Sequence, residues 1–429
     1  MVGLETVLSV KRISDRYQRQ AVDILSALLR FRTVGDNLSV HHEAISYLDK
    51  TARQMGLTPQ IMYPSTSRPL LVIKLDGQSK ETLLLLSHLD VAPVSNVGHW
   101  QYPPFGGYLA QGAIWGRGAV DCKGLVVVWL TILRWLQEYR KRLKTSIIFL
   151  VTTDEELGTG DSLRWVVERL STKKYISCAL NEGGGYPIQF GQKSFLTCQV
   201  GEKGHSLFFT TEQDKIKKIG PKKRDKVIHL SQPLSAVSHH LVKILLPSLF
   251  TQFSPRLLTA ILSWQQRNSP QQLDLTQLFF HQATIHSGQD SVSLDFRFLP
   301  DNTRSIEETH QNLQNRLRLQ GIRWILQHSS PSTSSSIHHS LYHCIHTTIK
   351  SICPQFNVIP HITPGYSDSR ILRLMGIPVF GFFPLLTGTP ITNIHSDDEH
   401  LKTSDLYYAI EILLEIILRV TSSPMAGLL

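Results

Sequence analysis

The apolar residues of this chain recur with two different spacings, which predict alternating helices and strands. Residues 15–35 and 42–56 carry them three or four positions apart, and this period predicts two amphipathic helices. Continuous apolar runs at 69–75 and 82–87 predict strands. The run Thr145–Thr153 is apolar almost throughout, as is typical of a strand that is buried on both faces at the centre of a sheet.

A further apolar segment, Val126–Leu136, precedes the last of these strands and is long enough to form a buried helix. The resulting order of strand, helix and strand is typical of an α/β layer fold. We therefore predict an α/β architecture for this part of the chain.

The pattern changes near residue 198 and returns near residue 332, which predicts an insertion between these positions. The elements predicted there are a strand from Cys198, a helix at Leu234–Leu249, strands within Thr284–Phe298 and a helix at Ser305–Leu319. The serine-rich stretch 329–336 predicts a hinge or a return linker, and a helix at His338–Ile352 follows it. We predict a first domain built from 1–197 and 332–429, and an inserted domain at 198–331.

The composition indicates a globular protein. Of the 429 residues, 41% are hydrophobic and 18% are charged, which excludes a disordered chain, and the length favours two domains. No apolar run is long enough to span a membrane, and the first residues lack the basic-then-apolar order of a secretory signal. The five cysteines are scattered and form no Cys-x-x-Cys pair, which favours reduced thiols and a cytoplasmic location.

The net charge of +10 raises the question of nucleic-acid binding. The densest basic patch, 215–224, is accompanied neither by interleaved aromatic residues nor by a nucleic-acid-binding motif. We therefore expect neither a nucleic acid nor a membrane as a partner. The patch is interpreted as a solvated loop or as a source of attraction for anionic substrates.

Residues that can bind metal ions follow several of the predicted strands. His88 and Asp90 come directly after the apolar run 83–86, in the position where open α/β sheets hold their active sites. Further carboxylates and one imidazole stand in later polar segments: Asp121, Glu155, Glu156, Glu182 and His395. Two imidazoles and several carboxylates, with almost no thiol, are the donor set of a hydrolytic metal centre.

Taken singly, each of these residues also has a structural interpretation. The segment 87–90 is compatible with an ordinary polar strand end, and His395 with a solvated loop. Asp121 and the pair Glu155–Glu156 are compatible with helix N-termini, which favour acidic side chains. Their joint occurrence in a fixed order favours a common function instead.

That order resembles one superfamily of enzymes. The motifs are His88-Leu89-Asp90-Val91 with Pro93, Trp100 with 103–105, Gly116-Arg117-Gly118 with Asp121 and 123–124, then 154–158, Glu182 and His395. They resemble, over about residues 70–400, the aminoacylase, carboxypeptidase S and succinyl-diaminopimelate desuccinylase superfamily of metallopeptidases. The first half is most similar to the carboxypeptidase S branch. The resemblance implies a zinc-peptidase-like catalytic domain with a central mixed sheet, and an inserted α+β lid domain that mediates dimerisation.

The resemblance also implies a set of metal ligands. Asp121 would bridge two divalent ions, with zinc expected and cobalt or manganese as alternatives. His88 and Glu182 would hold one ion, and Glu156 and His395 would hold the other. Such a pair of cations lowers the pKa of a shared water and polarises the scissile carbonyl.

Further roles follow from the same resemblance. Glu155 would be the general base that takes the proton from the water and delivers it to the leaving nitrogen. Asp90 would orient His88 through the second nitrogen of its ring. The peptide bond between Asp121 and Cys122 would be cis.

The inserted domain departs from the family pattern. The segment 228–233 is the nearest equivalent of the usual Gly-His-Ser-Ser-x-Pro, which predicts that His229 stabilises the tetrahedral oxyanion from the partner subunit. His205, in a literal but earlier Gly-His-Ser, is the alternative. Arg297 and Arg370 match family positions that recognise a substrate carboxylate, and the structural alternative for Arg370 is a brace against Asp368.

We expect a cytoplasmic, homodimeric di-metal amidohydrolase that cleaves a peptide or N-acyl-amino-acid amide bond next to a free carboxylate. The alternative among enzymes is a deacetylase or desuccinylase of an amino-acid biosynthetic intermediate, with the same chemistry on another acyl group. A non-catalytic member that binds amino acids or a protein partner is the alternative outside enzymes. Loss of Glu155 or of the ligands would indicate such a member, and all of them are present.

Overall fold

The computed structural model describes residues 13–64, 68–137, 143–171, 175–190, 192–212, 228–230, 281–287, 291–300, 306–317 and 321–422. The chain divides into two compact units. The first comprises 1–199, 335–359 and 367–429, and the second comprises 200–334 and 360–366. The sequence-based boundaries were 198 and 331, and the structure adds the short segment 360–366 to the second unit.

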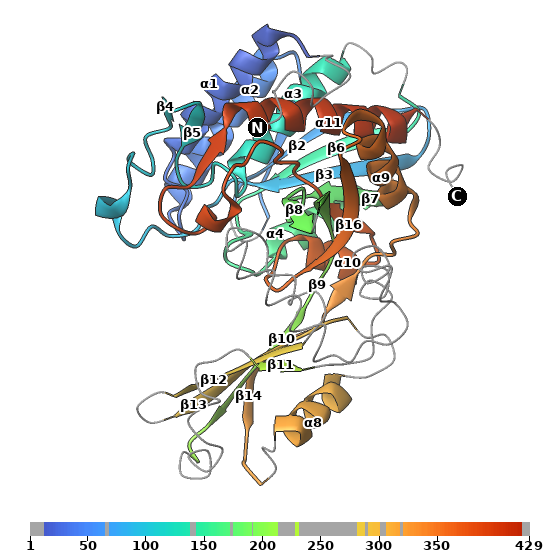
Figure 1. Cartoon of the computed structure of the whole chain (residues 1–429). Helices are drawn as coiled ribbons and strands as arrows, with labels where there is room; N and C mark the ends of the chain where they lie inside the picture. Colours follow the sequence, from blue (N-terminus) through green and yellow to red (C-terminus); the bar gives the residue numbers. More distant parts are fainter. Residues whose placement is uncertain are drawn as a thin grey trace. The chain divides into compact units, whose positions relative to one another are not determined.

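Figure 1 labels most of the elements of the first unit. Its helices are α1 (Asp15–Leu29), α2 (Leu38–Gln54), η2 (Val97–His99), α3 (Lys123–Gln137), α4 (Asp161–Ser171), α9 (Ser340–Ile352), α10 (Ser369–Leu374), η7 (Ile391–Asn393) and α11 (Thr403–Thr421). Its strands are β1 (Pro59–Met62), β2 (Leu70–Leu75), β3 (Glu81–His88), β4 (Tyr108–Ala110), β5 (Ala113–Trp115), β6 (Ser146–Thr152), β7 (Tyr175–Asn181), β8 (Pro187–Phe190), β17 (Val379–Gly381) and β18 (His400–Lys402). Strands β9 (Lys193–Glu202) and β16 (Phe356–Thr363) begin in this unit and end in the second.

The large sheet is mixed, with a parallel centre. Its strands follow the order β1-β2-β6-β3-β7-β17-β9, and β8 and β16 also pair with β9. The neighbours β6, β3, β7 and β17 are parallel, whereas β1, β2 and β9 pair antiparallel with their neighbours. In the register of β3 and β6, His88 lies opposite Thr152, so both strands end at the same edge. A small antiparallel sheet, β18-β5-β4, accompanies it.

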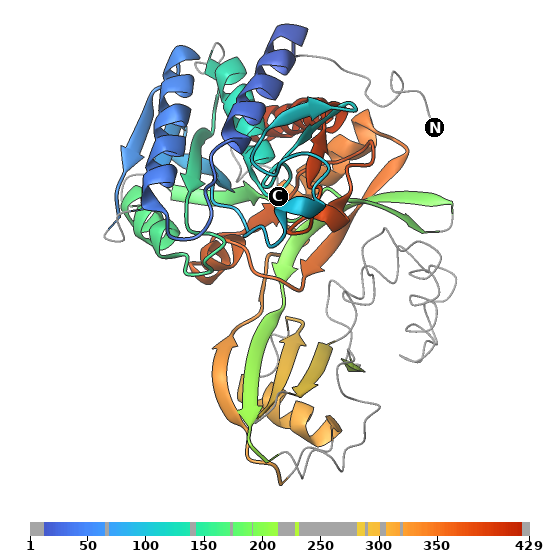
Figure 2. The same cartoon turned by 90° about the vertical axis from the view of Figure 1, so that its left-hand side faces the viewer.

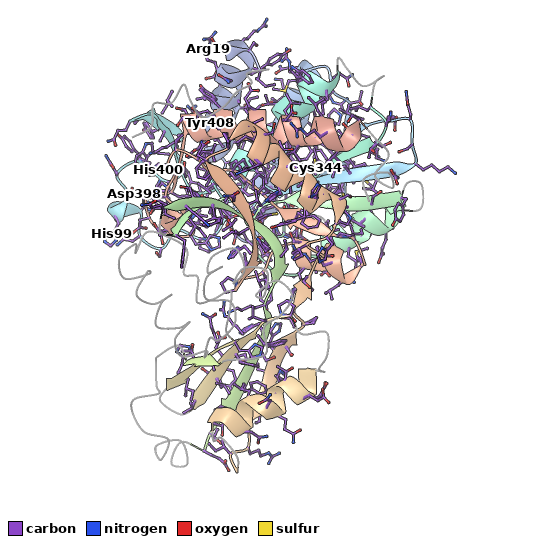
Figure 3. All side chains as sticks on the ribbon, turned by 45° about the vertical axis from the view of Figure 1, so that its right-hand side comes forward. Arg19, His99, Cys344, Asp398, His400 and Tyr408 are labelled. Carbon is purple, nitrogen blue, oxygen red and sulfur yellow. The ribbon has the colours of Figure 1, made fainter. Side chains whose placement is uncertain are left out.

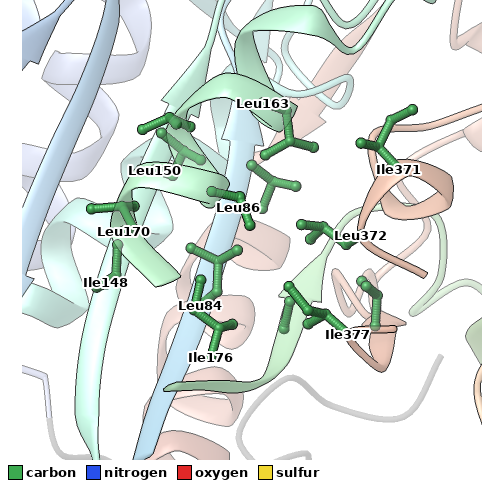
Figure 4. Packing of buried hydrophobic residues seen from close by; sticks show 14 of the residues in the cluster. Leu84, Leu86, Ile148, Leu150, Leu163, Leu170, Ile176, Ile371, Leu372 and Ile377 are labelled. Atoms are coloured by element: carbon green, nitrogen blue, oxygen red, sulfur yellow. The ribbon is translucent and has the colours of Figure 1, made fainter. Parts of the chain in front are cut away.

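Alternate residues of these strands point to opposite faces, and helices cover both. On one face, Leu84, Leu86, Ile148 and Leu150 pack against α4 and α10 in a buried cluster (Figure 4). On the other face lie α1, α3 and α11, which contact one another (Figures 1 and 2). Because both faces are covered, every residue of β6 is buried, as its apolar run predicted.

The second unit is built around an antiparallel sheet in the order β11-β12-β13-β10-β14. Its elements are β10 (Gly204–Thr210), β11 (Ile228–Leu230), β12 (His281–Ser287), β13 (Val292–Phe298), α8 (Ile306–Leu317), β14 (Ile325–Ser330) and β15 (Thr333–Ser334). Phe208, Leu294 and Phe296 point to one face, where Leu313 of α8 packs against them. In β13, the polar residues Ser293, Asp295 and Arg297 alternate with them on the other face. This unit is α+β and interrupts the first unit, as predicted.

The predicted elements that fall within the described residues are present, with ends shifted by a few residues. The first helix ends at Leu29, six residues earlier than expected. The serine-rich stretch 329–336, predicted as a hinge or a return linker, contains the end of β14 and the short strand β15, which pairs with β9. The expected helix at 234–249 and the basic patch 215–224 lie outside the described residues. Among the helices in the described part of the chain, none has the length and apolarity needed to cross a membrane.

Candidate metal centre

The parallel strands bring most of the predicted ligands to one edge of the large sheet. His88 is the last residue of β3, and Glu182 directly follows β7. Glu155 and Glu156 follow β6 after two intervening residues. Because the carboxyl ends of neighbouring parallel strands meet at one edge, these side chains converge there. Asp121 and His395 reach them from the loops that precede α3 and β18.

Two groups of donor atoms share the carboxylate of Asp121. Its Oδ1 lies 3.0 Å from His88 Nε2, which is 3.4 Å from Glu182 Oε2. Its Oδ2 lies 3.1 Å from His395 Nε2, which is 3.1 Å from Glu156 Oε1. In each group the donor atoms lie close enough to one another to hold a single ion. Asp121 therefore offers one oxygen to each group, which is the arrangement of a bridging ligand.

Glu155 lies beside the first group without belonging to either. Its Oε2 is 3.8 Å from His88 Nε2, and its side chain is 10% exposed. The neighbouring Glu156 faces His395 instead, so the two adjacent carboxylates point to different partners. Burial, together with the charge of nearby Glu182, raises the pKa of Glu155 well above its usual range, so this carboxylate is a stronger base than an exposed glutamate.

The surrounding carboxylates strongly affect one another. Burial, followed by the charge of Asp121, raises the pKa of Glu182 to about 8. Burial would also raise the pKa of Asp121, but hydrogen bonds from His395 and His88 outweigh it and hold that pKa well below its usual range. Hydrogen bonds to Asp121 and Glu156 raise the pKa of His395 to about 10. The centre is thus an environment that attracts positive charge.

This donor set fits two divalent cations. Four carboxylates, from Asp121, Glu155, Glu156 and Glu182, gather around two imidazoles, and two divalent ions would balance their charge. Imidazole and carboxylate donors suit zinc and similar ions. Cys122 also lies within reach, but burial raises the pKa of its thiol to about 12 and its Sγ accepts a hydrogen bond from the His88 amide at 3.3 Å. We therefore assign Cys122 a packing role.

Asp90 contacts His88 as predicted, but chiefly through a different atom. His88 Nδ1 lies 2.9 Å from the main-chain carbonyl of Asp90, whereas the nearest carboxylate oxygen is 3.5 Å away. The other carboxylate oxygen accepts a hydrogen bond from the Glu156 amide at 2.9 Å. Asp90 therefore connects His88 of the first ligand group to Glu156 of the second.

A neighbouring contact bears on the structural alternative for Glu155 and Glu156. It is Asp154 that accepts a hydrogen bond from the Ser162 amide in the first turn of α4, at 3.2 Å, and Glu155 and Glu156 lie ahead of this helix. The carboxylate of Asp368 accepts from the Thr152 hydroxyl at 2.9 Å. The Asp121–Cys122 peptide bond is cis, as the resemblance implied.

The loop that carries His395 is tied to the rest of the first unit by polar contacts. Asp398 Oδ1 accepts from the Gln101 amide at 2.6 Å, and the Asp398 carbonyl lies 2.8 Å from His400 Nδ1. Figure 3 shows Asp398, His400 and His99 at the same end of this unit. The sequence analysis missed the importance of Glu399 in this loop and of Arg117, which form a buried ion pair. The sequence did point to Arg117, because this residue belongs to the same motif as Asp121.

The predicted lid residues are only partly described. His229 lies in β11, where its backbone pairs with Gln282, but its side chain is outside the described residues. His205 in β10 has its Nδ1 3.0 Å from the Tyr366 hydroxyl and its Nε2 3.3 Å from Asp295.

The two predicted carboxylate-binding arginines lie in different units. Arg297 Nη1 donates to the Pro364 carbonyl at 2.9 Å, and its side chain is 38% exposed. Arg370 lies in α10 of the first unit. The roles of both arginines and of the two lid histidines stay predictions.

Comparisons with known proteins agree with this geometry. Residues 84–419 match the model of peptidase family M20/M25/M40. Aminoacylase-1 of Homo sapiens is 24% identical over 95% of this chain and 97% of its own length. Succinyl-diaminopimelate desuccinylase of Blochmanniella floridana is 25% identical over 80% of this chain and 84% of its own.

Among solved structures, an M20 family metallo-carboxypeptidase, Sso-CP2 from Sulfolobus solfataricus, shares the fold with a TM-score of 0.67. It is 17% identical, and the likeness covers 93% of this chain and 98% of that one. These findings confirm the resemblance drawn from the ordered motifs. The chain is a hydrolase that belongs to peptidase family M20/M25/M40.

Proposed function

We propose that the protein hydrolyses a peptide or N-acyl-amino-acid amide bond next to a free carboxylate, with two divalent ions in the centre described above. The observation that carries this proposal is the division of the Asp121 carboxylate between two ligand groups, with the unassigned Glu155 beside them. A shared carboxylate with an adjacent free base is the arrangement needed for metal-assisted hydrolysis.

Each residue of the centre has a task in this reaction. When bound, the ions lower the pKa of a water and polarise the scissile carbonyl. Glu155 accepts the proton of that water and passes it to the leaving nitrogen. Asp90 holds the His88 ring through its carbonyl and the Glu156 backbone through its carboxylate, so that both ligand groups keep their spacing.

The free carboxylate of the substrate would be recognised by arginine. A guanidinium binds a carboxylate through two parallel hydrogen bonds, which fix its orientation as well as its charge. Arg297 and Arg370 are the candidates, and the partly exposed side chain of Arg297 supports its availability. The names aminoacylase and metallo-carboxypeptidase among the similar proteins support this substrate class.

The alternative substrate is an acylated biosynthetic intermediate, since a succinyl-diaminopimelate desuccinylase is also among the similar proteins. Purified protein supplied with zinc, cobalt or manganese should be assayed on dipeptides, N-acyl amino acids and succinylated amino acids. Each substrate is paired with a version whose carboxylate is amidated. Cleavage of the free but not the amidated dipeptides and acyl amino acids is expected. Equal cleavage of both versions would contradict carboxylate recognition, and activity on succinylated compounds alone would favour the alternative.

We extend the proposal to a homodimer in which a lid histidine completes the site of the partner. His229 and His205 are both candidates, and the ring of His205 is the one whose contacts, to Tyr366 and Asp295, can be described. A lid variant mixed with a Glu155→Gln variant should regain activity, because a heterodimer contains one intact composite site. Exchange of subunits without recovered activity would argue for a site built from one chain.

The same proposal places the enzyme in the cytoplasm. None of the five cysteines forms a disulfide, and all five are buried, which suits a reducing compartment. Fractionation of cells that express the chain would test this location.

A further inference from the structure

A buried ion pair lies directly behind the bridging carboxylate. Arg117 Nη1 is 2.7 Å from Glu399 Oε2, and the two side chains are 2% and 0% exposed. The second oxygen, Glu399 Oε1, accepts hydrogen bonds from the amides of Val120 at 3.0 Å and Asp121 at 3.2 Å. One carboxylate therefore holds both the arginine and the backbone of the bridging ligand.

The pair connects the loop of Asp121 to the loop of His395, which together supply two of the three ligands of the second group. Arg117 lies four residues before Asp121, and Glu399 lies four residues after His395. Main-chain contacts reinforce the link, since the Gly116 amide donates to the Glu399 carbonyl at 2.9 Å and β5 pairs with β18. The distance between Asp121 Oδ2 and His395 Nε2 is thus set by the junction at Arg117 and Glu399.

The loop of His395 needs such external support. His395 and Asp398 both adopt left-handed backbone conformations, with φ of +59°, which non-glycine residues keep only where the surroundings impose them. The His395 side chain is 52% exposed, so packing around the ring contributes little to its position. In contrast, His88 ends a central strand and Glu182 directly follows another. The first ligand group therefore rests on the sheet, and the second depends on the loops.

Stability alone does not account for a charged pair at this place. Removing two ions from water costs several kcal/mol for each, and well-packed apolar side chains of similar volume often serve stability as well or better. What apolar side chains lack is an acceptor for the amides of Val120 and Asp121. The geometry of the acceptor is therefore the specific contribution of Glu399.

We infer that the Arg117–Glu399 pair is a positioning device that holds Asp121 in register with His395, and that it governs the affinity of the ion bound by Asp121, Glu156 and His395. This inference rests on the proposed two-ion function. The second ion is expected to depend on the pair more than the first, because Asp121 and His395 both lie on loops that the pair joins. The first ion shares Asp121 but keeps His88 and Glu182, which extend from the ends of strands.

The test is the double variant Arg117→Met, Glu399→Leu, in which neither buried charge is left alone. Metal-free protein is dialysed against buffered zinc, the bound ions are counted by elemental analysis, and unfolding of the metal-free form is followed in denaturant. We expect the metal-free variant to fold with a lower free energy of unfolding, because the amides of Val120 and Asp121 lose their acceptor. The loss of affinity should be about tenfold to hundredfold for one ion and smaller for the other. The matched control, Glu415→Gln with Arg419→Gln, removes a more exposed ion pair on α11 and should keep both ions.

A second comparison identifies which ion is lost. In a Glu156→Ala background, where the second group is already broken, the double change should weaken the remaining ion little further, because the two changes act on one site. Wild-type affinity for both ions in a folded double variant would overturn the inference, as would an equal loss of both. Should the double variant not fold, Arg117→Lys must show the same selective weakening, since a lysine keeps the charge but not the planar fork. Wild-type protein that binds no ions would instead overturn the proposed function.

Discussion

Replacing Glu155 with glutamine separates proton transfer from metal binding. The amide has nearly the shape of the carboxylate, so the packing around this 10%-exposed side chain is kept. Glu155 belongs to neither ligand group, and its Oε2 lies 3.8 Å from His88 Nε2. Both ions should therefore remain bound, while the amide has no lone pair basic enough to accept the proton of the water.

The expected loss of turnover follows from the removal of the general base alone. A positioned general base contributes about a hundredfold to ten-thousandfold to the rate, which corresponds to about 3 to 5 kcal/mol of activation free energy. A loss of turnover within this range is expected, because the amide at position 155 cannot accept the proton of the water. The loss should fall on kcat with KM nearly unchanged, because the substrate is still bound.

Glu156→Gln is the matched control, one position along the chain. Glu156 Oε1 lies 3.1 Å from His395 Nε2 in the second ligand group, so its replacement should weaken binding of one ion. Excess zinc should then restore part of the activity of this variant but none of the activity of Glu155→Gln. Steady-state kinetics and elemental analysis of both proteins provide the assay. A Glu155→Gln enzyme that keeps turnover within about tenfold of the wild type with both ions bound would refute the role of general base.

Four further outcomes are expected. Asp121→Ala should lose both ions in elemental analysis, because its two oxygens face both groups. Arg297→Lys should raise KM more than it lowers kcat on substrates with a free carboxylate, because lysine keeps the charge but loses the bidentate geometry. Either His229→Ala or His205→Ala should lower turnover on the order of a hundredfold at constant metal content, as loss of an oxyanion donor does. Leu86→Ala, at a fully buried position, should lower the free energy of unfolding by about 2 to 5 kcal/mol in a denaturant titration.

Each of these expectations has a contrary result. Full metal occupancy in the Asp121 variant would exclude a bridging role. If Arg297→Lys lowers kcat and leaves KM unchanged, Arg297 acts in the chemical step and not in binding the substrate. If neither histidine variant changes turnover, the lid supplies no oxyanion donor. An unfolding free energy unchanged by the Leu86 substitution would contradict the tight packing of its cluster.

The sequence alone determined the elements whose signal is local. The apolar run in β6 predicted a buried central strand because a strand covered by helices on both faces has no polar side. The end of β3 at His88 was predictable in the same way, since the apolar run stops there. The candidate ligands were predicted from residue types in an order that resembles one superfamily, and a comparison of motif order requires no knowledge of distances.

The tertiary structure decided the contacts between residues far apart in the chain. The division of the Asp121 oxygens between His88 and His395 depends on where two loops meet, and no local pattern records it. The bond from the Glu156 amide to Asp90 and the ion pair of Arg117 with Glu399 have the same origin. Apolar periodicity specifies which face of an element is buried, whereas the pairing of polar atoms depends on the order of the strands and the path of the loops. These contacts became visible only when the sheet had brought their loops to one edge.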